Sequence, residues 1–579
     1  MSAISMTRRE ALTLAVSVAG AAGALNASDA RAASGTGRMP GELDRFIHSY
    51  LPAMNAPGLT LALTSAQDTL HTGGYGYADL TAKTPVTTAH LFEIGSITKS
   101  FVAVMVLQLH QEGKIDLRKP ILHYLPWLAM ETLYGEVTVH HLLTHSSGMP
   151  DDAPALPTIP GSRPQQAFKP GTTFHYSNWG YDVLGRLVEK MDGRSWEAAL
   201  RQRILAPLGM TETAPLITSS IRSRLVRSYV PLYDDRPYPR HGALTPAGNL
   251  TVTTSSGCIA STPGDMARYM RMYLNRGAGS SGRILSEDSF KLLSTPYIAA
   301  EEFGPGASYG YGLAVDQLDG HKRLRHTGGM ASFMSAIQID LDAGFGAFAS
   351  INAQLGYRPN PVVQYGLQLL RARQEHKSPP AAPVPDEGLA VAHPEQYEGT
   401  YTASDGRRLE VRAAKERLVL RTDGKDIPLQ QAEPDQFIAD DPKFALYPLV
   451  FARASQTEQQ KAADPKSTPP VVELAYGADS YFHAAHPQTD APVAATDLNR
   501  YVGQYYSESP WLGCMRVVQR RGQLWLGGAA ALVVCGDRMF RVGDPSSPDT
   551  LEFVDVIDGL AQGLRFAGGE FKRVPEEVT

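Results

Sequence analysis

Ser96 and Lys99 are the residues of this sequence whose types and spacing best suit covalent chemistry. They begin an apolar segment that runs through Leu109, with hydrophobic residues at intervals of three and four that predict a helix ending near Gly113. Residues three apart share a helix face, so the lysine amine would lie beside the serine hydroxyl. A hydroxyl becomes a good nucleophile once a base removes its proton, and burial lowers the pKa of a lysine so that it can accept one. Alone, the four-residue pattern more often marks a helix start with a solvated lysine.

A second stretch with reactive side chains is Tyr176-Ser177-Asn178. It follows Pro170-Gly171 and precedes a predicted helix with apolar residues from Val183 to Met191. A tyrosine has a reference pKa of about 10 and acts as a base near neutral pH only beside a cation. Taken singly, Tyr176 could pack against Trp179, and Asn178 could simply cap the helix.

The third stretch is His326-Thr327-Gly328-Gly329. It precedes two predicted strands, Met334 to Asp340 and Gly346 to Asn352, whose short Gly-containing connection indicates an antiparallel sheet. A strand histidine with satisfied hydrogen bonds and a glycine bulge would explain the same residues without any chemistry.

Taken together, Ser96-Ile97-Thr98-Lys99, Tyr176-Ser177-Asn178 and His326-Thr327-Gly328 resemble the penicillin-recognising serine hydrolases, in particular the class C β-lactamase-like group. His141 to Gly148 matches this family as well, and the resemblance covers about residues 40–373. It implies that Ser96 attacks a carbonyl and forms an acyl-enzyme, with Lys99 and Tyr176 sharing the work of the base. Either a protonated Lys99 makes Tyr176 a phenolate, or a neutral Lys99 takes the proton itself.

The resemblance also assigns the surrounding groups. Asn178 would hold Lys99 or a substrate amide, and the backbone N–H groups of Ser96 and Gly329 would form the oxyanion hole, where one donor is typically worth about 3 kcal/mol to the transition state. Neither a metal nor an organic cofactor is needed. The predicted substrate-binding and oxyanion residues are Asn178, His326, Thr327, Gly328 and Gly329.

One motif departs from most β-lactamases of this family. His326 replaces their lysine, and a histidine with a reference pKa of about 6.5 is only partly charged at pH 7. Ala331-Ser332-Phe333 also replaces the Pro-Gly-Phe often found there. The His-Thr-Gly version is more similar to the esterases, D-amino-acid peptidases and related hydrolases, so tight recognition of a substrate carboxylate is not expected.

Two further patterns have structural interpretations. His141 and His145 have the spacing of a helical metal pair, but the glutamate of His-Glu-x-x-His is missing, so we interpret both as structural. Of the three cysteines, Cys514 and Cys535 lie on predicted neighbouring strands, so the sequence allows a disulfide between them. The alternative is that all three cysteines are buried free thiols.

Length and composition indicate a multidomain globular protein. The 579 residues exceed what a single core holds, and 43% hydrophobic and 20% charged residues are ordinary for folded domains. The patterns predict an α+β fold: an antiparallel sheet flanked by helices, followed by an all-β barrel region. The predicted domains are a hydrolase domain over 38–375, a Pro/Ala-rich linker over 376–390, and barrels over 391–486 and 497–579.

The all-β tail carries a weak internal repeat. Gln396 to Tyr401 is echoed by Arg500 to Tyr505, which fits two small barrels or two halves of one, with a break over 487–496. This tail resembles the lipocalin-like barrels appended to some of these peptidases, including the bacterial D-aminopeptidases. In such relatives a barrel loop can enter the catalytic cleft and select the substrate, and the same is a hypothesis for this chain.

Residues 1–32 predict an export signal. Arg8-Arg9 precede the apolar run from Ala11 to Leu25, and Ala30-Arg31-Ala32 forms an A-x-A cleavage site, in a context that resembles a twin-arginine signal. An uncleaved, anchoring N-terminus is the alternative. No later apolar run is long enough to span a bilayer, so we expect a periplasmic or secreted protein without a membrane span after cleavage near Ala32. The net charge of −5 offers no basic surface for nucleic acid.

The sequence therefore predicts an exported serine hydrolase that acts through an acyl-enzyme on D-amino-acid-containing peptides, amides or esters. A β-lactamase or DD-carboxypeptidase is the alternative among enzymes, and a non-catalytic penicillin-binding-like scaffold is the alternative outside them. The expected partner is a small-molecule or short-peptide substrate, with the cell wall as one source, and a homo-oligomer is compatible with the sequence.

Overall fold

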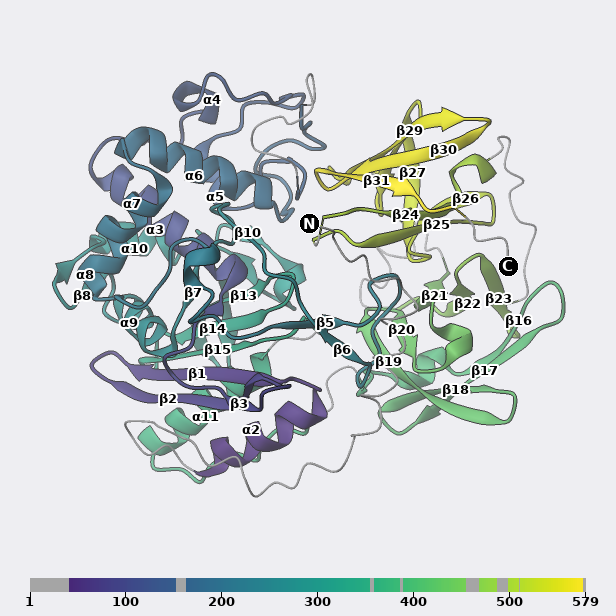
Figure 1. Cartoon of the computed structure of the whole chain (residues 1–579), viewed down its shortest axis with the longest axis horizontal. Coiled ribbons are helices and arrows are strands. Elements are labelled where there is room, and N and C mark those ends of the chain that lie inside the picture. The colour runs from purple at the N-terminus through teal and green to yellow at the C-terminus, as the bar shows by residue number, and fades with distance from the viewer. Residues whose placement is uncertain are drawn as a thin grey trace, which may run out of the picture.

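The computed structural model describes residues 41–152, 163–354, 359–385, 389–454, 468–486, 498–509 and 511–575. A layered α/β part forms the left half of Figure 1, and two all-β units form the right half. The predicted export signal and the predicted break over 487–496 lie outside the described residues. Among the residues that are described, no helix is both long and apolar enough to cross a membrane.

A nine-stranded antiparallel sheet organises the α/β part. Residues 58–79 form an antiparallel hairpin, and its first strand lies inside the sheet between its hairpin partner and the strand that ends at Ile351. Both faces of that strand are buried, with Leu59, Leu61 and Leu63 on one side and Ala62 on the other. The order across the sheet is β10 (Ile298–Ala299), β11 (Ser308–Tyr309), β12 (Ala314–Leu318), β13 (His321–Gly329), β14 (Met334–Asp340), β15 (Phe345–Ile351), β1 (Gly58–Ser65), β2 (Thr69–Asp79) and β3 (Thr84–Pro85).

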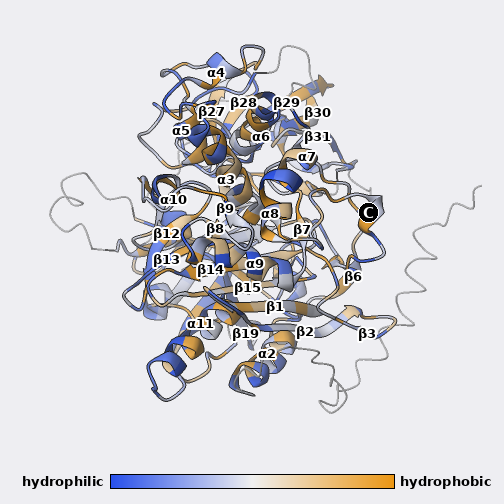
Figure 2. Ribbon diagram, turned by 90° about the vertical axis from the view of Figure 1, so that its left-hand side faces the viewer, coloured by the Kyte–Doolittle hydropathy of each residue, from blue (hydrophilic) through white to orange (hydrophobic). Residues whose placement is uncertain are grey.

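Helices cover both faces of this sheet and bury two separate cores. Figure 2 shows apolar β1 and β15 between a lower helical layer and an upper one. The lower layer is α2 (Gly41–Ala53) and α11 (Asn360–Gln374). The upper layer contains α3 (Thr98–Gln111), α6 (Asn178–Asp192) and α9 (Pro263–Leu274), with the shorter α4 (Ile121–Tyr124), α5 (Val139–Leu143), α7 (Trp196–Leu200), α8 (Ala206–Leu208) and α10 (Glu287–Leu293).

Side-chain caps fix where α6 and α9 begin. Thr262 caps α9 by accepting a hydrogen bond from the N–H of Asp265, as its sequence predicts. In α6 the cap is Ser177, whose hydroxyl accepts from the N–H of Gly180. The alternative that Asn178 caps this helix is therefore wrong. Because the neighbouring serine does this work, worth about 1 kcal/mol, the Asn178 side chain is left for other partners.

The tail forms two closed barrels, which settles the choice between two barrels and two halves of one. The first contains β16 (Gly399–Thr402), β17 (Arg408–Ala414), β18 (Arg417–Thr422), β19 (Lys425–Glu433), β20 (Gln436–Ala439), β21 (Leu449–Arg453), β22 (Val471–Tyr476) and β23 (Asp479–His483). The second contains β24 (Gly503–Tyr506), β25 (Cys514–Arg520), β26 (Gln523–Leu526), β27 (Ala530–Gly536), β28 (Met539–Val542), β29 (Thr550–Ile557), β30 (Leu560–Phe566) and β31 (Gly569–Arg573).

The sequence repeat occupies the same place in both barrels. In the first, the buried Tyr401 hydroxyl donates to the carbonyl of Tyr397 at 2.8 Å, and in the second Tyr505 donates to Tyr501 at 2.9 Å. In each barrel, this tyrosine–carbonyl hydrogen bond therefore joins the first strand to the turn that precedes it.

Polar contacts tie the three parts together. Arg520 of the second barrel is buried and donates to the carbonyl of Gly477 in the first barrel at 3.0 Å. A ribbon of the α/β part, formed by β5 (Tyr229–Pro231) and β6 (Leu244–Pro246), extends towards the barrels in Figure 1. Its loop contacts both barrels, through Arg240 and through Asp235.

The cysteine alternatives also resolve. Cys514 lies on β25 and Cys535 on β27, with β26 between them, so the expectation of neighbouring strands is wrong. All three cysteines are free thiols, and only Cys258 is buried. The Cys514 sulfur is instead within 2.9 Å of the Gln504 side-chain amide.

Candidate active site

Ser96 is held between the sheet and α3 by a short 3₁₀ turn, Gly95–Ile97. Gly95 has a φ of 53°, and a Cβ on it would lie 2.8 Å from the carbonyl oxygen of Gly329 at the end of β13. A Cβ on Gly328 would lie 1.9 Å from the carbonyl oxygen of Ile94. The glycines therefore let the serine turn and the end of β13 touch, so the backbone N–H groups of Ser96 and Gly329 belong to abutting segments.

Lys99 lies beneath the serine and is fully buried. Its amine is 3.0 Å from the Ser96 hydroxyl, 2.6 Å from the Asn178 side-chain oxygen and 3.0 Å from the carbonyl oxygen of Ser256. Burial lowers the pKa of Lys99 to about 8, against the opposing effect of nearby carboxylates, of which Asp151 is the strongest. A sizeable fraction of this amine is therefore neutral near pH 8 and can accept a proton.

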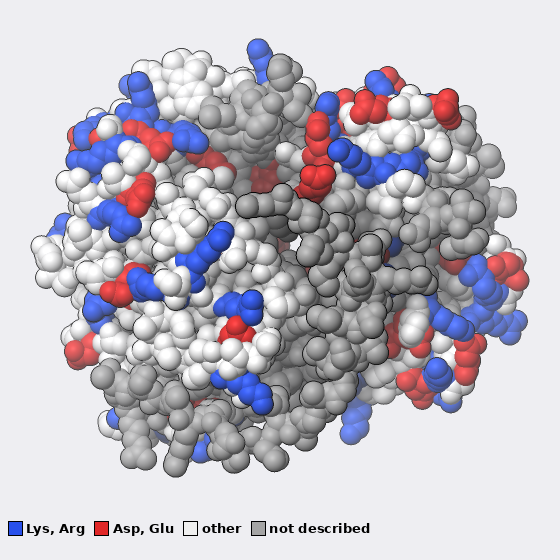
Figure 3. Space-filling view, viewed as in Figure 1, with Lys and Arg blue, Asp and Glu red and all other residues white. Residues whose placement is uncertain are grey.

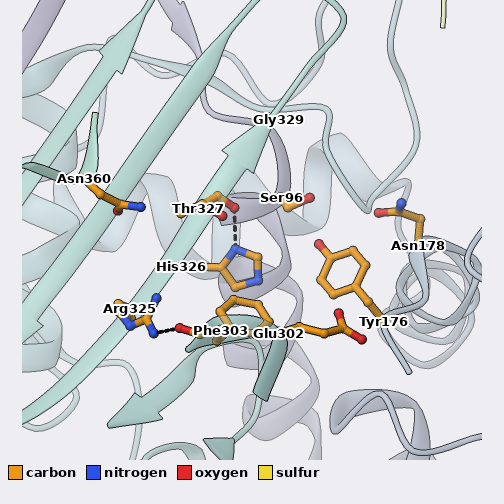
Figure 4. A pocket seen from close by; sticks show the side chains of 10 residues that line it. All are labelled: Ser96, Tyr176, Asn178, Glu302, Phe303, Arg325, His326, Thr327, Gly329 and Asn360. Atoms are coloured by element: carbon orange, nitrogen blue, oxygen red, sulfur yellow. Dashed lines mark hydrogen bonds between the residues drawn. The ribbon is translucent and has the colours of Figure 1, made fainter. Parts of the chain in front are cut away.

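Tyr176 lies on the other side of the serine. Its hydroxyl points towards Ser96 in Figure 4, and the Lys99 amine is 4.8 Å from the centre of its ring. The ring also stacks on His145, with centres 4.4 Å apart. The Nδ1 of His145 accepts a hydrogen bond from the N–H of Ser177, and burial holds the pKa of this histidine well below its usual value, so a neutral imidazole supports the tyrosine.

His326 is also buried beside the serine, although its ring is bonded to the protein. Its Nε2 lies 3.0 Å from the Tyr309 hydroxyl and its Nδ1 lies 2.5 Å from the Thr327 carbonyl oxygen. These contacts place the imidazole against the aromatic wall of the site, with Phe303 next to it.

These side chains surround a pocket of about 510 Å³. Its walls come from the 3₁₀ turn that carries Ser96, the segment that leads into α6, β13, a short segment before β11 and the start of α11. Figure 4 shows the side chains from these segments around the pocket. The structure thus brings together every predicted site residue except two that lie just beneath the surface: Lys99 under Ser96, and Gly328 against Ile94. The lining residues are Ser96, Tyr176, Asn178, Glu302, Phe303, Arg325, His326, Thr327, Gly329 and Asn360.

One end of the site is acidic, and the second barrel contributes to it. Asp549, in the turn between β28 and β29, accepts a hydrogen bond of 2.8 Å from the N–H of Asp151 and forms an ion pair of 3.4 Å with His175. Asp151 in turn accepts from the backbone and side-chain N–H groups of Asn178, both at 3.0 Å. Acidic side chains also gather along the edge of the second barrel that faces the α/β part in Figure 3. The turn that carries Asp549 therefore contacts Asp151 behind the pocket, whereas none of the described barrel residues is among those that line the pocket. The hypothesis that a barrel loop enters the cleft and selects the substrate stays a prediction.

Burial and mutual repulsion set the protonation of this acidic end. Burial, and then the charge of Asp152, raise the pKa of Asp151 to about 7. Burial also raises the pKa of Glu302, which lines the pocket. For Asp549 burial acts in the same direction, but its bonds to His175 and Asp151 outweigh it and lower the pKa. The pKa of Asp549 is thus lowered, whereas the pKa values of Asp151 and Glu302 are raised.

Sequence reasoning missed Glu302, Arg325, Asn360 and Asp549. None belongs to a motif, although Arg325 directly precedes one, and Asp549 lies 398 residues from the Asp151 N–H that it binds.

The two histidines with metal-like spacing make separate contacts: the N–H of Thr138 donates to His141, and that of Ser177 to His145. No cluster of three or more potential ligands exists among the described residues.

Comparison with known proteins agrees with this geometry. The family model described as Beta-lactamase matches residues 43–367. Penicillin-binding protein 4 of Amycolatopsis lactamdurans is 27% identical over 368 residues, which cover 60% of this chain and 94% of that protein. Protein flp of Staphylococcus aureus is 24% identical over 352 residues, 58% of this chain and 67% of that protein.

Among solved structures, the octameric penicillin-binding protein homologue from Pyrococcus abyssi superposes with a TM-score of 0.53 and 25% identity. The match covers 76% of this chain and 99% of that one. The family model spans more than half of the chain and contains all three motifs that meet at the pocket. This chain belongs to the beta-lactamase family and is a serine hydrolase.

Proposed function

We propose that this protein is an exported hydrolase that cleaves D-amino-acid-containing peptides, amides or esters through an acyl-enzyme on Ser96. The observation that carries the proposal is the 3.0 Å contact between the Lys99 amine and the Ser96 hydroxyl at the floor of an open pocket. A fully buried lysine with a lowered pKa next to a hydroxyl is the arrangement that nucleophilic catalysis needs.

The reaction proceeds in two displacement steps. Lys99, with Tyr176 as relay, takes the proton of Ser96 while the serine oxygen bonds to the substrate carbonyl carbon. The N–H groups of Ser96 and Gly329 bind the resulting oxyanion. The same base then gives its proton to the leaving amine or alcohol as the carbonyl–leaving-group bond breaks. A water molecule attacks the ester by the same route in reverse and returns the serine hydroxyl.

The charges around the pocket support a substrate with a free amino group. Glu302 lines the pocket, and Asp549 and Asp151 lie behind the same end. An ammonium group placed there meets carboxylates in a partly desolvated site, where charge pairing is stronger than in water. An amino acid amide or the N-terminus of a peptide supplies such a group. The preference for the D-configuration follows from the resemblance of the His-Thr-Gly motif.

Arg325 and Asn360 favour the alternative, a β-lactamase or DD-carboxypeptidase, because they line the pocket and suit a substrate carboxylate. The Arg325 guanidinium, however, donates to the Asp316 carboxylate at 2.6 Å and to the carbonyl of Phe303. Asp316 also accepts two hydrogen bonds from Arg323, so it neutralises Arg325 only in part, but these bonds hold the Arg325 guanidinium in place. His326 is likewise bonded to Tyr309. Because both side chains already have partners within the protein, recognition of a substrate carboxylate is the weaker proposal.

A substrate panel tests the proposal. We expect hydrolysis of D-alanine p-nitroanilide and of a D-alanine p-nitrophenyl ester, little hydrolysis of the N-acetylated anilide, and still less of a chromogenic cephalosporin. Mass spectrometry should find the acyl adduct on the peptide containing Ser96, and Ser96→Ala should abolish it. Folded protein that gives no adduct with any ester, fluorophosphonate or penicillin would support the non-catalytic scaffold instead.

Export is tested separately. We propose that residues 1–32 direct the protein out of the cytoplasm and are removed near Ala32. N-terminal sequencing of the mature protein, with Arg8→Lys and Arg9→Lys together as the variant, should show cleavage after Ala32 in the natural protein and retention of the precursor in the variant.

A further inference from the structure

A second hollow of about 800 Å³ lies where the α/β part meets both barrels. The ribbon loop after β5, strands β19 and β20 of the first barrel, and the turn between β24 and β25 of the second barrel form its walls. Nothing in the catalytic mechanism uses it. It is larger than the catalytic pocket, and cavities between domains are frequent ligand sites.

The walls of this junction cavity are tied together. The N–H of Arg240 in the ribbon loop donates to the Gln430 side chain of the first barrel at 2.9 Å. Asp235, five residues earlier, pairs with Arg516 of the second barrel at 2.7 Å, and both side chains are largely buried. Direct hydrogen bonds and an ion pair therefore hold the α/β part and both barrels together around this cavity.

Its lining is acidic. Asp234, Glu433 and Glu508 line the cavity, and Arg236 is the only basic side chain among its lining residues. Arg236 donates to Asp235 at 2.8 and 3.1 Å, but Asp235 also pairs with Arg516, so one carboxylate serves two guanidinium groups. The three carboxylates of the lining still outnumber its single basic side chain, and a cationic ligand complements this acidic excess.

Aromatic rings line the same space. Tyr233 is 56% exposed, Tyr506 46% and Trp511 47%, which is unusual for side chains of this size. Aromatic faces beside carboxylates attract ammonium and guanidinium groups through the ring quadrupole. The side-chain amides of Gln354 and Gln431, which also line the cavity, are suited to hydrogen bonds with peptide groups.

The cavity is adjacent to the catalytic pocket along the chain. Gly329 lines the pocket, whereas Ala331 and Ser332 line the cavity. A turn closed by the 2.9 Å hydrogen bond from the Met330 N–H to the Phe333 carbonyl separates them. Gly329 and Ala331 are two residues apart, which is about 7 Å at most, or two residues of an extended peptide.

We propose that the junction cavity is a distal substrate subsite that binds a basic segment on the leaving-group side of an oligopeptide. This inference rests on the proposed function, because it uses the pocket's acidic end for the substrate amine. Glu302 lies across the pocket from Gly329 in Figure 4, so a peptide whose N-terminal amine meets Glu302 extends past Gly329 towards the cavity. The enzyme then prefers peptides over single amino acid amides.

Binding to the Ser96→Ala variant of the full chain tests this subsite without turnover. Isothermal titration calorimetry would compare three peptide amides, D-Ala-Gly-Lys-Lys, D-Ala-Gly-Ala-Ala and D-Ala-Gly-Glu-Glu. We expect the lysine peptide to bind at least tenfold more tightly than the glutamate peptide, with the difference shrinking between 50 and 500 mM salt. Equal affinities, or a preference for glutamate, overturn the proposal.

Variants of the cavity lining test whether the preference for the lysine peptide arises in the junction cavity. Glu433→Gln with Glu508→Gln should reduce the lysine preference severalfold, and Trp511→Ala should weaken binding of the lysine peptide. Trp127→Ala is the matched control, since Trp127 is 50% exposed and lines neither hollow. An unchanged preference in the double variant overturns the assignment of the cavity. Circular dichroism checks that each variant is folded.

The two proposals fail in different ways. If the natural protein hydrolyses D-alanine p-nitroanilide but the Ser96→Ala variant shows no charge preference, the subsite is wrong and the hydrolase function stands. If no substrate forms an adduct while the lysine preference and its loss in the double variant persist, the proposed function is wrong and the cavity still binds basic peptides.

Discussion

The carboxylate of Asp549 in the second barrel accepts a 2.8 Å hydrogen bond from the backbone N–H of Asp151 in the α/β part. Asp151 holds Asn178, which in turn contacts the Lys99 amine at 2.6 Å. A residue on the last barrel is therefore linked to the base beside Ser96 through two intermediates. This link makes the barrel part of the site's electrostatics.

Replacing Asp549 should alter recognition of the substrate amine. In Asp549→Asn, we expect kcat/KM for D-alanine p-nitroanilide to fall about tenfold, because an anion of the acidic end is lost, and that for its N-acetyl derivative to change little. Steady-state kinetics on both substrates checks this. Asp544→Asn is the control, since Asp544 lies in the same turn and its carboxylate accepts hydrogen bonds from Ser546. An equal loss on both substrates would indicate a structural role.

The pH dependence of acylation should follow Lys99. In the proposed mechanism the neutral amine of Lys99 is the base, so kcat/KM should rise with pH and level off above about 8. The charge of Asp151 raises the lysine pKa, and Asp151→Asn should therefore move the rising limb to lower pH. Rate profiles between pH 5.5 and 10 measure the shift. The exposed Asp288→Asn on α10 is the control, and a limb that stays in place in Asp151→Asn contradicts the assignment.

Glu93, which is not part of the candidate active site, should make the free energy of unfolding depend on pH. It lies on β4 (Phe92–Glu93), which pairs with β7 (Ala260–Ser261), and burial raises its pKa to about 8. From about pH 5 to 8 the folded state keeps this proton while the unfolded state has lost it, so the contribution of Glu93 to stability falls as pH rises.

Glu93→Gln removes this effect. The variant should match the natural protein near pH 4.5 and be more stable at pH 8 by on the order of a few kcal/mol. Denaturant unfolding at pH 4.5, 6 and 8 gives the comparison, with the exposed Glu287→Gln as control. A difference that does not grow with pH would contradict the buried protonated state.

Arg520 should be needed for the two barrels to stay together. It is 4% exposed, donates to the carbonyls of Gly477 and Gly528, and stacks on Trp525. In Arg520→Met both carbonyls lose their donor, and we expect a loss of about 2–3 kcal/mol in unfolding free energy. The surface Arg565→Met, which only breaks exposed ion pairs, should cost less than about 1 kcal/mol. Equal costs in thermal or denaturant unfolding would show that the interface contact is not stabilising.

The sequence predicted the parts of the site that depend on local patterns. Ser96 and Lys99 are neighbours because a helix turn makes them so, and helices begin at Thr98 and Asn178, where the apolar periodicity predicts them. The antiparallel pairing of β14 with β15 also followed from a short loop.

The parts that depend on folding over long distances could not be predicted. Glu302 and Asn360 reach the pocket from separate loops and helices, and Asp549 reaches Asp151 only because the second barrel lies against the α/β part. The cysteine expectation failed for a related reason: Leu524 and Trp525 of β26 pair with both flanking strands, so the two thiols are kept apart.

The position of Asp549 in the second barrel has a consequence for the order in which the site is completed. A nascent polypeptide that has released only its first 400 residues already contains the nucleophile and its amine, but lacks the anion that the last barrel supplies. The site therefore gains this anion only after the second barrel has been synthesised and has packed against the α/β part.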